Sequence, residues 1–388
     1  MAGIMKKKTV YFDNASSSYP RSPLIKAMMD EYLESGVGNI GRGQYASAYS
    51  LEEKAFEARE ALSSFFNAPD PSSIVFSAGG TASLNLFLKG YLKEGDHVIV
   101  SPLEHNAVMR PLEDLRNKGL VEYSAMPCRK GVADPSALEK LIRSNTRAIV
   151  CNHASNVSGS VQDIEAIGRV ANDRGLVFCV DSCQSAGCIG IDVQRMNINF
   201  LAFTGHKGLL GLPGIGGAVI SGLEIEPLIC GGTGSVSSSL DMPKFAPDRF
   251  EAGTQNIPGI LSLKCGVDFI NFVGLENIRK HKQELRNHFL NLIANSRISE
   301  FVSVAGSDSV ENSGIVSISV KSHDAASVAD DLDRKFGICT RVGLQCAPLA
   351  HKTLGTFDAG GTIRFSFSYF NTIDEVEYAV GALEEIIL

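Results

Sequence analysis

The sequence predicts an α/β protein with a mostly parallel central sheet in a large domain and a smaller α+β domain at the C-terminal end. The chain has 388 residues, which exceeds a single average domain. Apolar strand segments and helical segments alternate between about residues 74 and 203, as in parallel sheets covered on both faces by helices. After Gly253 long helical segments and short strands follow. We therefore expect domains at 1–253 and 254–388.

The segment before the sheet is predicted to contain an arm and two helices. Residues 1–20 form the arm, which can pack on the small domain. Ser22-Pro23 is typical of a helix start, with Ser as N-cap and Pro in the first turn, and this helix ends near Gly36. Ser50-Leu51-Glu52-Glu53 fits a capping box and predicts a second helix that ends near Phe66.

The sheet elements follow in order along the chain. Strands are predicted at 74–76, 97–101, 121–125, 147–152, 176–180 and 200–203, with helices at 81–92, from 106, from 134 and at 163–174. In the small domain we expect helices at 257–272, 275–294, 325–336 and 374–387, and strands at 315–320 and 363–367. Ligands bind at the carboxyl ends of strands in such sheets, so the loops after the strands are the expected site.

Composition excludes several classes of function. The formal net charge of −7, without a basic stripe, argues against a nucleic-acid partner. No apolar core follows Lys6-Lys7-Lys8, and the longest apolar runs are short and contain glycine, so neither a signal peptide nor a membrane span is expected. Nine cysteines without framework or metal-ligand spacing predict free thiols, a reducing cytoplasm and no metal site.

The stretch from Phe203 to Gly211 contains Lys207 between glycines, with Thr204 and His206 just before it. A lysine amine whose pKa is lowered can form a Schiff base, and pyridoxal phosphate (PLP) is the usual biological aldehyde. Thr and His are suited to phosphate oxygens. Taken alone, Lys207 would more often be an ordinary surface lysine in a glycine-rich loop. The groups that follow the other strands favour the cofactor.

Those groups come in a consistent order. Gly79-Gly80-Thr81 opens a helix and could bind phosphate, although such turns are common. It lacks the dinucleotide spacing G-x-G-x-x-G, which argues against a nicotinamide-dependent oxidoreductase. His105 could stack on an aromatic ring or be structural. Asp181, at the end of an apolar strand, could keep a pyridinium nitrogen protonated and so make PLP an electron sink.

These segments resemble the class V, fold-type I family of PLP-dependent enzymes, in the branch of cysteine desulfurases and selenocysteine lyases. The matching segments are Asp13-Asn14-Ala15, Glu104-His105, Ser155-Asn156-x-x-Gly159, Asp181-x-x-Gln184, Gly205-His206-Lys207, Arg249 to Asn256 and Arg341-x-Gly343-x-x-Cys346-Ala347. The resemblance implies the fold-type I architecture, the cofactor pyridoxal 5′-phosphate and a homodimer with active sites at the subunit interface.

The resemblance also implies a role for each matching residue. Lys207 would carry PLP and move the α-proton, His105 would stack on the ring, and Asp181 would pair with its nitrogen. The remaining cofactor contacts would come from Gly80, Thr81, Asn156, Gln184, Thr204, His206 and the partner subunit's Thr254. Arg364 would bind the substrate carboxylate, and Ala15, Asn156 and Arg341 would lie on the substrate side.

Cys346 would supply the thiolate that takes sulfur from the substrate and becomes a persulfide. A thiolate is the nucleophile, so a nearby His or Arg should lower the thiol pKa; Arg341, His351 and Lys352 are the neighbours in sequence. The alternative is a buried structural thiol. The sequence departs from the family pattern at Ala82, where Glu is usual, and at Gly41, where His is common.

The function expected from this resemblance is a cysteine desulfurase, which converts L-cysteine to L-alanine and passes sulfur from Cys346 to an acceptor protein or thiol. Selenocysteine lyase and cysteine sulfinate desulfinase are alternatives on the same scaffold, and a class V aminotransferase is a more remote one. A noncatalytic partner subunit is least favoured, because Lys207 and Cys346 are both present.

Overall fold

The computed structural model describes residues 9–306, 311–321 and 323–388. Lys6-Lys7-Lys8 and the start of the expected arm therefore lie outside the described residues. Within them, the larger sheet has seven strands in the order β2 (Ile74–Ser77), β10 (Gly216–Ile220), β9 (Phe200–Thr204), β8 (Val177–Asp181), β7 (Thr146–Asn152), β3 (Asp96–Val100) and β4 (Val121–Ala125). Strand β10 is antiparallel to its neighbours β2 and β9, and the other pairs are parallel. The predicted α/β class is confirmed.

Strand β10 was not predicted. The run from Ile215 to Ile220 is apolar and broken by glycines, a pattern that weakens a strand assignment. The glycines have a packing reason here. A Cβ on Gly217 would lie 2.3 Å from the Val75 carbonyl oxygen, and one on Gly216 would lie 2.5 Å from that of Phe203. Glycine therefore lets β10 fit between β2 and β9.

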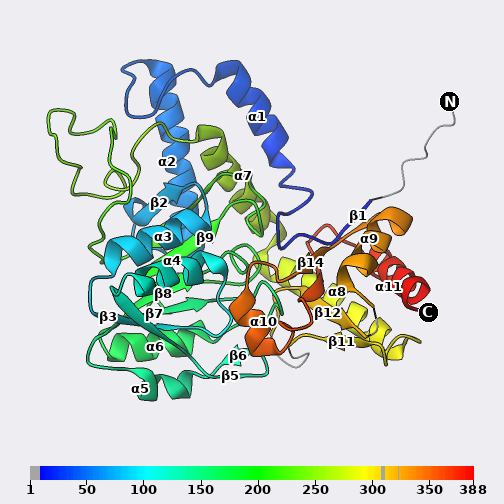
Figure 1. The fold of residues 1–388 in the computed structure, drawn as a ribbon. Coiled ribbons are helices and arrows are strands. Elements are labelled where there is room, and N and C mark those ends of the chain that lie inside the picture. The colour runs from blue at the N-terminus through cyan, green and yellow to red at the C-terminus, as the bar shows by residue number, and fades with distance from the viewer. Residues whose placement is uncertain (1–8, 307–310, 322) are drawn as a thin grey trace.

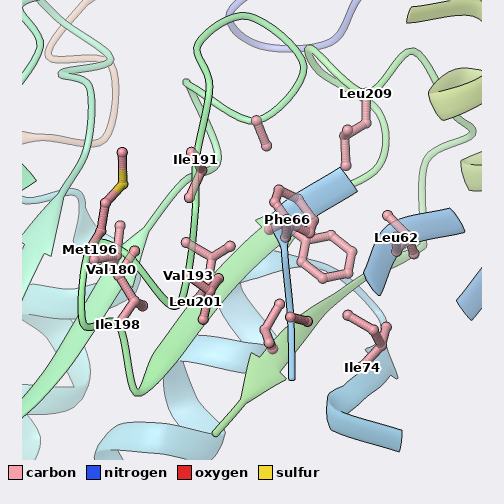
Figure 2. Packing of buried hydrophobic residues seen from close by; sticks show 14 of the residues in the cluster. Leu62, Phe66, Ile74, Val180, Ile191, Val193, Met196, Ile198, Leu201 and Leu209 are labelled. Atoms are coloured by element: carbon pink, nitrogen blue, oxygen red, sulfur yellow. The ribbon is translucent and has the colours of Figure 1, made fainter. Parts of the chain in front are cut away.

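Helices cover both faces of the sheet because the strand residues alternate between two cores (Figure 1). On one face Ile149 and Cys151 join α2 (Ala46–Phe66), α6 (Ile164–Asp173) and α7 (Ile257–Val273). Figure 2 shows part of this core. On the other face Ala148 and Val150 pack with α3 (Gly80–Tyr91) and α4 (Asn106–Asn117). Near these layers lie α1 (Leu24–Ser35), the 3₁₀ turns η1 (Pro71–Ser73) and η2 (Pro135–Ala137), α5 (Leu138–Leu141), and the hairpin β5 (Cys128–Arg129) and β6 (Val132–Ala133).

Helix α2 begins five residues earlier than the capping-box pattern predicts. The structure places Ser50 inside the helix and Tyr45 at its N-cap, without a side-chain cap hydrogen bond. Ala46 and Ala48 favour the helical backbone, and buried Ala48, Leu51 and Ala55 lie on one face of the helix. Burial of this face accounts for the earlier start.

A second, antiparallel sheet contains β11 (Val302–Val304), β12 (Ile315–Val320), β15 (Thr362–Ser366) and β14 (Arg341–Gly343). Its core includes residues of α8 (Leu275–Asn295), α9 (Ala325–Phe336) and α11 (Ile373–Ile387). Strand β1 (Val10–Tyr11) pairs with β13 (Ile338–Cys339), and Val10 and Phe12 join the same core. The short helix α10 (Pro348–Leu354) follows Cys346. The domain division at residue 253 stays a prediction.

Among the described residues, no single helix has the length and apolar character of a membrane span. Helices α7 and α8 meet those criteria only as a pair, and they are bent by 80° relative to each other.

We predict that Gly266→Ala destabilises the fold by about 1–3 kcal/mol, because overpacking forces the backbone to shift. A Cβ at Gly266 in α7 would lie 1.8 Å from the Leu209 carbonyl oxygen in the loop that carries Lys207. Gly381→Ala in α11 is the matched control, since a Cβ there meets nothing within 4 Å. We expect the control to be neutral or to stabilise by up to about 1 kcal/mol. Urea unfolding of both variants measures the difference, and equal stabilities would contradict the packing argument.

Candidate active site

A cavity of about 90 Å³ lies at the carboxyl ends of the parallel strands. It is lined mainly by residues that follow the strands: Gly80, Thr81, His105, Ala107, Asn152, Ala154, Asn156, Asp181, Cys183, Gln184, Thr204, His206 and Lys207. The loops that sequence reasoning selected therefore converge on one cavity. Strands β2 and β9 run in the same direction on either side of β10, so their carboxyl ends share an edge of the sheet.

Lys207 is held through its backbone. The loop after β9 closes on itself, with the Gly211 amide donating to the Gly205 carbonyl oxygen at 2.8 Å. Ser18 adds two contacts from the N-terminal segment. Its amide donates to the His206 carbonyl oxygen, and its hydroxyl donates to the Lys207 carbonyl oxygen, both at 2.8 Å. The main chain at Lys207 is thus fixed while its side chain faces the cavity.

The N-terminus of α3 lines the cavity through Gly80 and Thr81. Gly79 has a φ of 142°, and α3 has no side-chain cap among the described residues, so its first amides remain available. A Cβ on Gly80 would lie 2.2 Å from Cys183 Sγ, which excludes any larger residue without a shift. Thr81, Thr204 and His206 line the same cavity. Such a helix terminus with hydroxyls beside it suits a phosphate group.

His206 is half-buried. Burial, with the nearby charges of Lys207 and Arg21, lowers the pKa of His206 to about 4. Its ring is therefore neutral at pH 7 and can donate one N–H hydrogen bond to a phosphate oxygen.

Asp181 and His105 also line the cavity. Asp181 is 6% exposed, and its Oδ1 accepts from the Cys183 amide at 2.9 Å. His105 is the N-cap of α4, where its Nδ1 accepts from the Ala107 amide at 3.0 Å. Burial, followed by the charge of Lys207, lowers the pKa of His105. A neutral ring that accepts at Nδ1 has its proton on Nε2.

Glu104 is a buried acid for which the sequence indicated no role beyond its place in a matching motif. Its Oε1 accepts from the Asn152 amide at 2.7 Å, and its Oε2 has no hydrogen-bond partner in the described part of the chain. Burial raises the pKa of Glu104 to about 8, and the nearby Asp181 charge adds to this rise. A hydrogen bond from Ser101 acts in the opposite direction but is outweighed. The protonated acid adds no second negative charge beside Asp181.

Arg364 on β15 is 3% exposed and is held by three oxygen atoms. Its Nη2 donates to Asp13 Oδ1 at 2.9 Å and to Ser16 Oγ at 2.8 Å, and its Nη1 donates to the Asn156 carbonyl oxygen at 2.9 Å. Its Nε has no partner among the residues described. The Arg364 guanidinium is therefore fixed beside Asn156, and two of its five N–H donors, one on Nε and one on Nη1, remain available among the described residues. The pairing with Asp13 and Ser16 was not anticipated, although Asp13 lies in a matching motif.

Ala15 and Gln184 connect the N-terminal segment to the cavity. Gln184 Nε2 donates to the Ala15 carbonyl oxygen at 2.9 Å, and the Ala15 amide donates to Ser366 Oγ at the same distance. Ala15 thus lies next to the cavity wall, and its place on the substrate side stays a prediction.

Cys346 is exposed, and backbone contacts fix its position. The Asn106 amide, next to His105, donates to the Cys346 carbonyl oxygen at 2.8 Å. Asn156 Nδ2 donates to the Gln345 carbonyl oxygen at 2.7 Å. Gln345 and Cys346 both have left-handed backbone conformations, with φ of 40° and 57°. The cysteine loop is therefore attached to the two segments that carry His105 and Asn156.

A buried hydrogen-bond chain supports this loop from behind. The Gln345 side chain donates to the Thr362 carbonyl oxygen at 2.8 Å, while its Oε1 lies 2.6 Å from His351 Nε2. His351 Nδ1 lies 2.7 Å from Thr356 Oγ1. Burial lowers the pKa of His351 to about 4, so the ring is neutral at pH 7. His351 thus anchors Gln345 and brings no charge to Cys346.

Five expected residues lie outside the cavity lining: Ala15, Thr254, Arg341, Cys346 and Arg364. Hydrogen bonds connect Ala15, Arg364 and the Cys346 loop to segments of the lining, but not Thr254 or Arg341. Thr254 is exposed and lies outside the cavity lining, and its assignment to a partner subunit's site stays a prediction. Arg341 pairs with Arg364 in the β14–β15 register and is exposed. Of the two departures, Ala82 is exposed on α3, and Gly41 has a φ of 68° and lines a different pocket.

We predict that Glu104→Gln makes protein stability less dependent on pH between 5 and 8. The folded-state pKa of Glu104 is raised, so the folded chain keeps a proton that the unfolded chain releases above pH 4.5. Stability is then lost as pH rises toward 8, on the order of a few kcal/mol, and glutamine removes this loss. Melting temperatures at several pH values measure it, with Glu94→Gln as the exposed control. A parallel pH profile for Glu104→Gln and the native chain would contradict a protonated Glu104.

Comparisons with known proteins agree with the geometry. The aminotransferase class-V family matches residues 10–379. A probable cysteine desulfurase from Methanothermobacter thermautotrophicus is 35% identical over 97% of this chain and 94% of its own length. A second one, from Pyrococcus abyssi, is 32% identical over 99% and 95%. The apo structure of a cysteine desulfurase from Thermococcus onnurineus has a TM-score of 0.90 at 32% identity, over 98% of this chain and 94% of that one. The resemblance inferred from the sequence is confirmed: this chain belongs to the aminotransferase class-V family and is similar throughout to cysteine desulfurases.

Proposed function

We propose that this protein is a PLP-dependent cysteine desulfurase that releases L-alanine from L-cysteine and keeps the sulfur on Cys346. The main support is the attachment of the Cys346 loop to Asn106 and Asn156, at 2.8 Å and 2.7 Å. These contacts attach the thiol loop to a cavity lined by Lys207 and the buried Asp181, and buried Arg364 donates to the backbone of Asn156 in that lining. The similarity to cysteine desulfurases over the full chain supports the same conclusion.

The residues of the cavity fit PLP. The uncapped start of α3, with Thr81, Thr204 and His206, suits the phosphate, and Lys207 can bind the aldehyde. Asn156 Oδ1 is buried and lacks a partner among the described residues, as expected where a bound group completes the hydrogen bonding. Asp181 would hold the pyridine nitrogen and His105 would contact the ring. When bound, PLP supplies an electron sink for the substrate's α-carbon.

The protein groups then divide the remaining work. Arg364 binds the substrate carboxylate and orients the amino acid, with Nε and the second Nη1 hydrogen as available donors. Lys207 Nζ is the base that moves the α-proton. The hydrogen bonds from Ser18 and the loop closure at Gly205 hold the Lys207 backbone in position for this step. His105 can supply a proton from Nε2, because its Nδ1 is occupied by the Ala107 amide.

Cys346 acts on the sulfur. Its thiolate attacks the substrate Sγ, the Cβ–Sγ bond breaks, and the bonding electrons stay with the carbon fragment that becomes alanine after protonation. The substrate sulfur remains on Cys346 as a persulfide. The left-handed backbone at Gln345 and Cys346 directs this loop into its contacts with both cavity segments.

Exposed apolar side chains support the proposed homodimer. Tyr49 and Phe56 of α2 line a pocket of about 830 Å³ together with Gly253 and Gln255, the neighbours of Thr254. Exposed Val236, Leu240 and Phe245 lie on the 229–245 segment, part of which lines the same pocket. An apolar surface of this kind is typical of an interface. The cytoplasmic location also stays a proposal, supported by the free state of all nine cysteines.

Selenocysteine lyase and cysteine sulfinate desulfinase use the same groups and are tested with the same assay. Alanine formation from cysteine, selenocysteine and cysteine sulfinate distinguishes these reactions. We expect cysteine to give alanine and Cys346 persulfide in equal amounts in the first turnover. Amino-group transfer to a keto acid without alanine release would instead indicate the aminotransferase alternative.

We predict that Cys346→Ala abolishes sulfide release from L-cysteine while PLP remains bound at Lys207. The thiol is the sulfur acceptor, and its removal leaves the cavity lining unchanged. Sulfide release is measured with a reducing thiol present, and borohydride reduction followed by mass mapping locates the cofactor. Cys230→Ala, which removes another exposed thiol, is the matched control. Normal sulfide release by Cys346→Ala would disprove the persulfide role.

We predict that His351→Ala lowers kcat for alanine formation about tenfold or more while KM for cysteine and PLP content change little. The substitution removes the support of Gln345 and loosens the Cys346 loop, and a misplaced reacting group costs rate rather than binding. His351→Gln, which can still donate to Gln345, should recover part of kcat. If kcat, KM and PLP content instead fell together in both variants, His351 would be needed only for folding.

A further inference from the structure

Cys346 lies at one end of a surface groove of about 370 Å³ that adjoins the cavity through Thr81, His105 and Ala107. The other groove residues come from two helices. Residues Thr81, Asn85 and Lys89 are spaced by four along α3, and residues Asn106, Arg110 and Asp114 are spaced by four along α4. Four-residue spacing puts each set on one helix face. The groove therefore runs along two neighbouring helix faces away from Cys346.

The groove carries positive charge. Lys89 and Arg110 are exposed, and neither takes part in an ion pair within the part of the chain that the structure describes. The acidic residue of the groove, Asp114, is already paired with Lys118 at 2.9 Å. The hydrogen bond from Lys118, helped by the charges of Lys118 and Lys89, lowers the pKa of Asp114. Two cations are thus left to interact with a partner.

We propose that this groove binds the sulfur acceptor, and that the acceptor is a protein segment whose cysteine is flanked by acidic side chains. The inference rests on the proposed function, because it requires a Cys346 persulfide. The acceptor thiolate attacks the outer sulfur of that persulfide, and the bond between this sulfur and Cys346 breaks. The bonding electrons return to Cys346 as a thiolate, and the outer sulfur stays on the acceptor as a new persulfide.

The groove positions such a segment without disturbing the cavity. Cys346 is fixed against the start of α4, and Arg110 is one helical turn further along the same face. An acidic residue next to the acceptor cysteine can therefore approach Arg110 while the thiol approaches Cys346. The charges also attract the acceptor from solution, an effect that salt screens.

The test compares short peptides that contain a central cysteine flanked by glutamates, by glutamines or by lysines. Each is offered to the holoenzyme with L-cysteine, and sulfur transfer to the peptide is measured by mass spectrometry. The variant is Lys89→Glu with Arg110→Glu. The control is Lys140→Glu with Lys280→Glu, which makes the same charge change at exposed lysines outside the groove. Alanine formation with 2-mercaptoethanol, a neutral thiol, measures the underlying reaction.

We expect the rate of sulfur transfer to the glutamate peptide to be about tenfold lower in the groove variant at low salt. In 1 M salt the decrease should be much smaller. Transfer to the glutamine peptide and alanine formation with 2-mercaptoethanol should not change. Equal loss with every acceptor, or equal loss in the control variant, would overturn the proposal. So would loss that occurs with mercaptosuccinate but not with the glutamate peptide, since a small anionic thiol would then be the partner. Absence of alanine formation by the native protein with 2-mercaptoethanol would contradict the desulfurase function itself.

Discussion

The burial of one guanidinium constrains how this chain is assembled. Arg364 is 3% exposed, and removing a charge from water is costly unless a partner carboxylate and further hydrogen bonds compensate for it. The compensation comes from distant parts of the sequence: Asp13 and Ser16 near the N-terminus and the Asn156 carbonyl oxygen after β7. The need to pair this charge holds the N-terminal segment and the second sheet against the edge of the larger sheet. Its oxygen partners leave two N–H donors available, which the proposed function assigns to the substrate carboxylate.

The same edge also holds the thiol loop. Asn156 donates to the loop through its side chain and accepts from Arg364 through its carbonyl oxygen, so one residue is in contact with both groups. Removing a buried partner leaves an unsatisfied polar group, at a cost of about 1–3 kcal/mol. The positions of Arg364 and of the Cys346 loop therefore both depend on Asn156, so the proposed substrate binding and sulfur acceptance would be coupled through this residue.

Much of the fold could be predicted because periodicity reports burial. Strand β12 and helix α9 begin and end where the pattern places them, since their apolar residues face a core. Strand β4 also has the predicted bounds, although Val121 is its one buried residue. Strand β10 was missed because its glycines serve close packing between neighbouring strands, which no local pattern reveals. The start of α2 was misplaced because burial of Ala48 outweighed a capping signal at Ser50.

The site was predictable to the extent that its residues follow strands. Lys207, Asp181, His105 and Thr81 line one cavity because parallel strands end at one edge. The pairing of Arg364 with Asp13, the protonated Glu104 and the chain from His351 to Gln345 were not predicted. Each depends on burial in the folded chain and on which side chains the fold brings together. The residue types alone therefore did not indicate these interactions.

The antiparallel strand β10 has a consequence for how such a site can change. The segment that leaves β9 with Lys207 returns at the same edge of the sheet as β10. Strand β10 also pairs with β2, which leads into the glycine turn at the start of α3. The loop that carries Lys207 is thus connected to the sheet at both ends, through β9 and β10. Its length could vary during evolution, moving the amine relative to a stationary anion-binding turn, without any change in strand order.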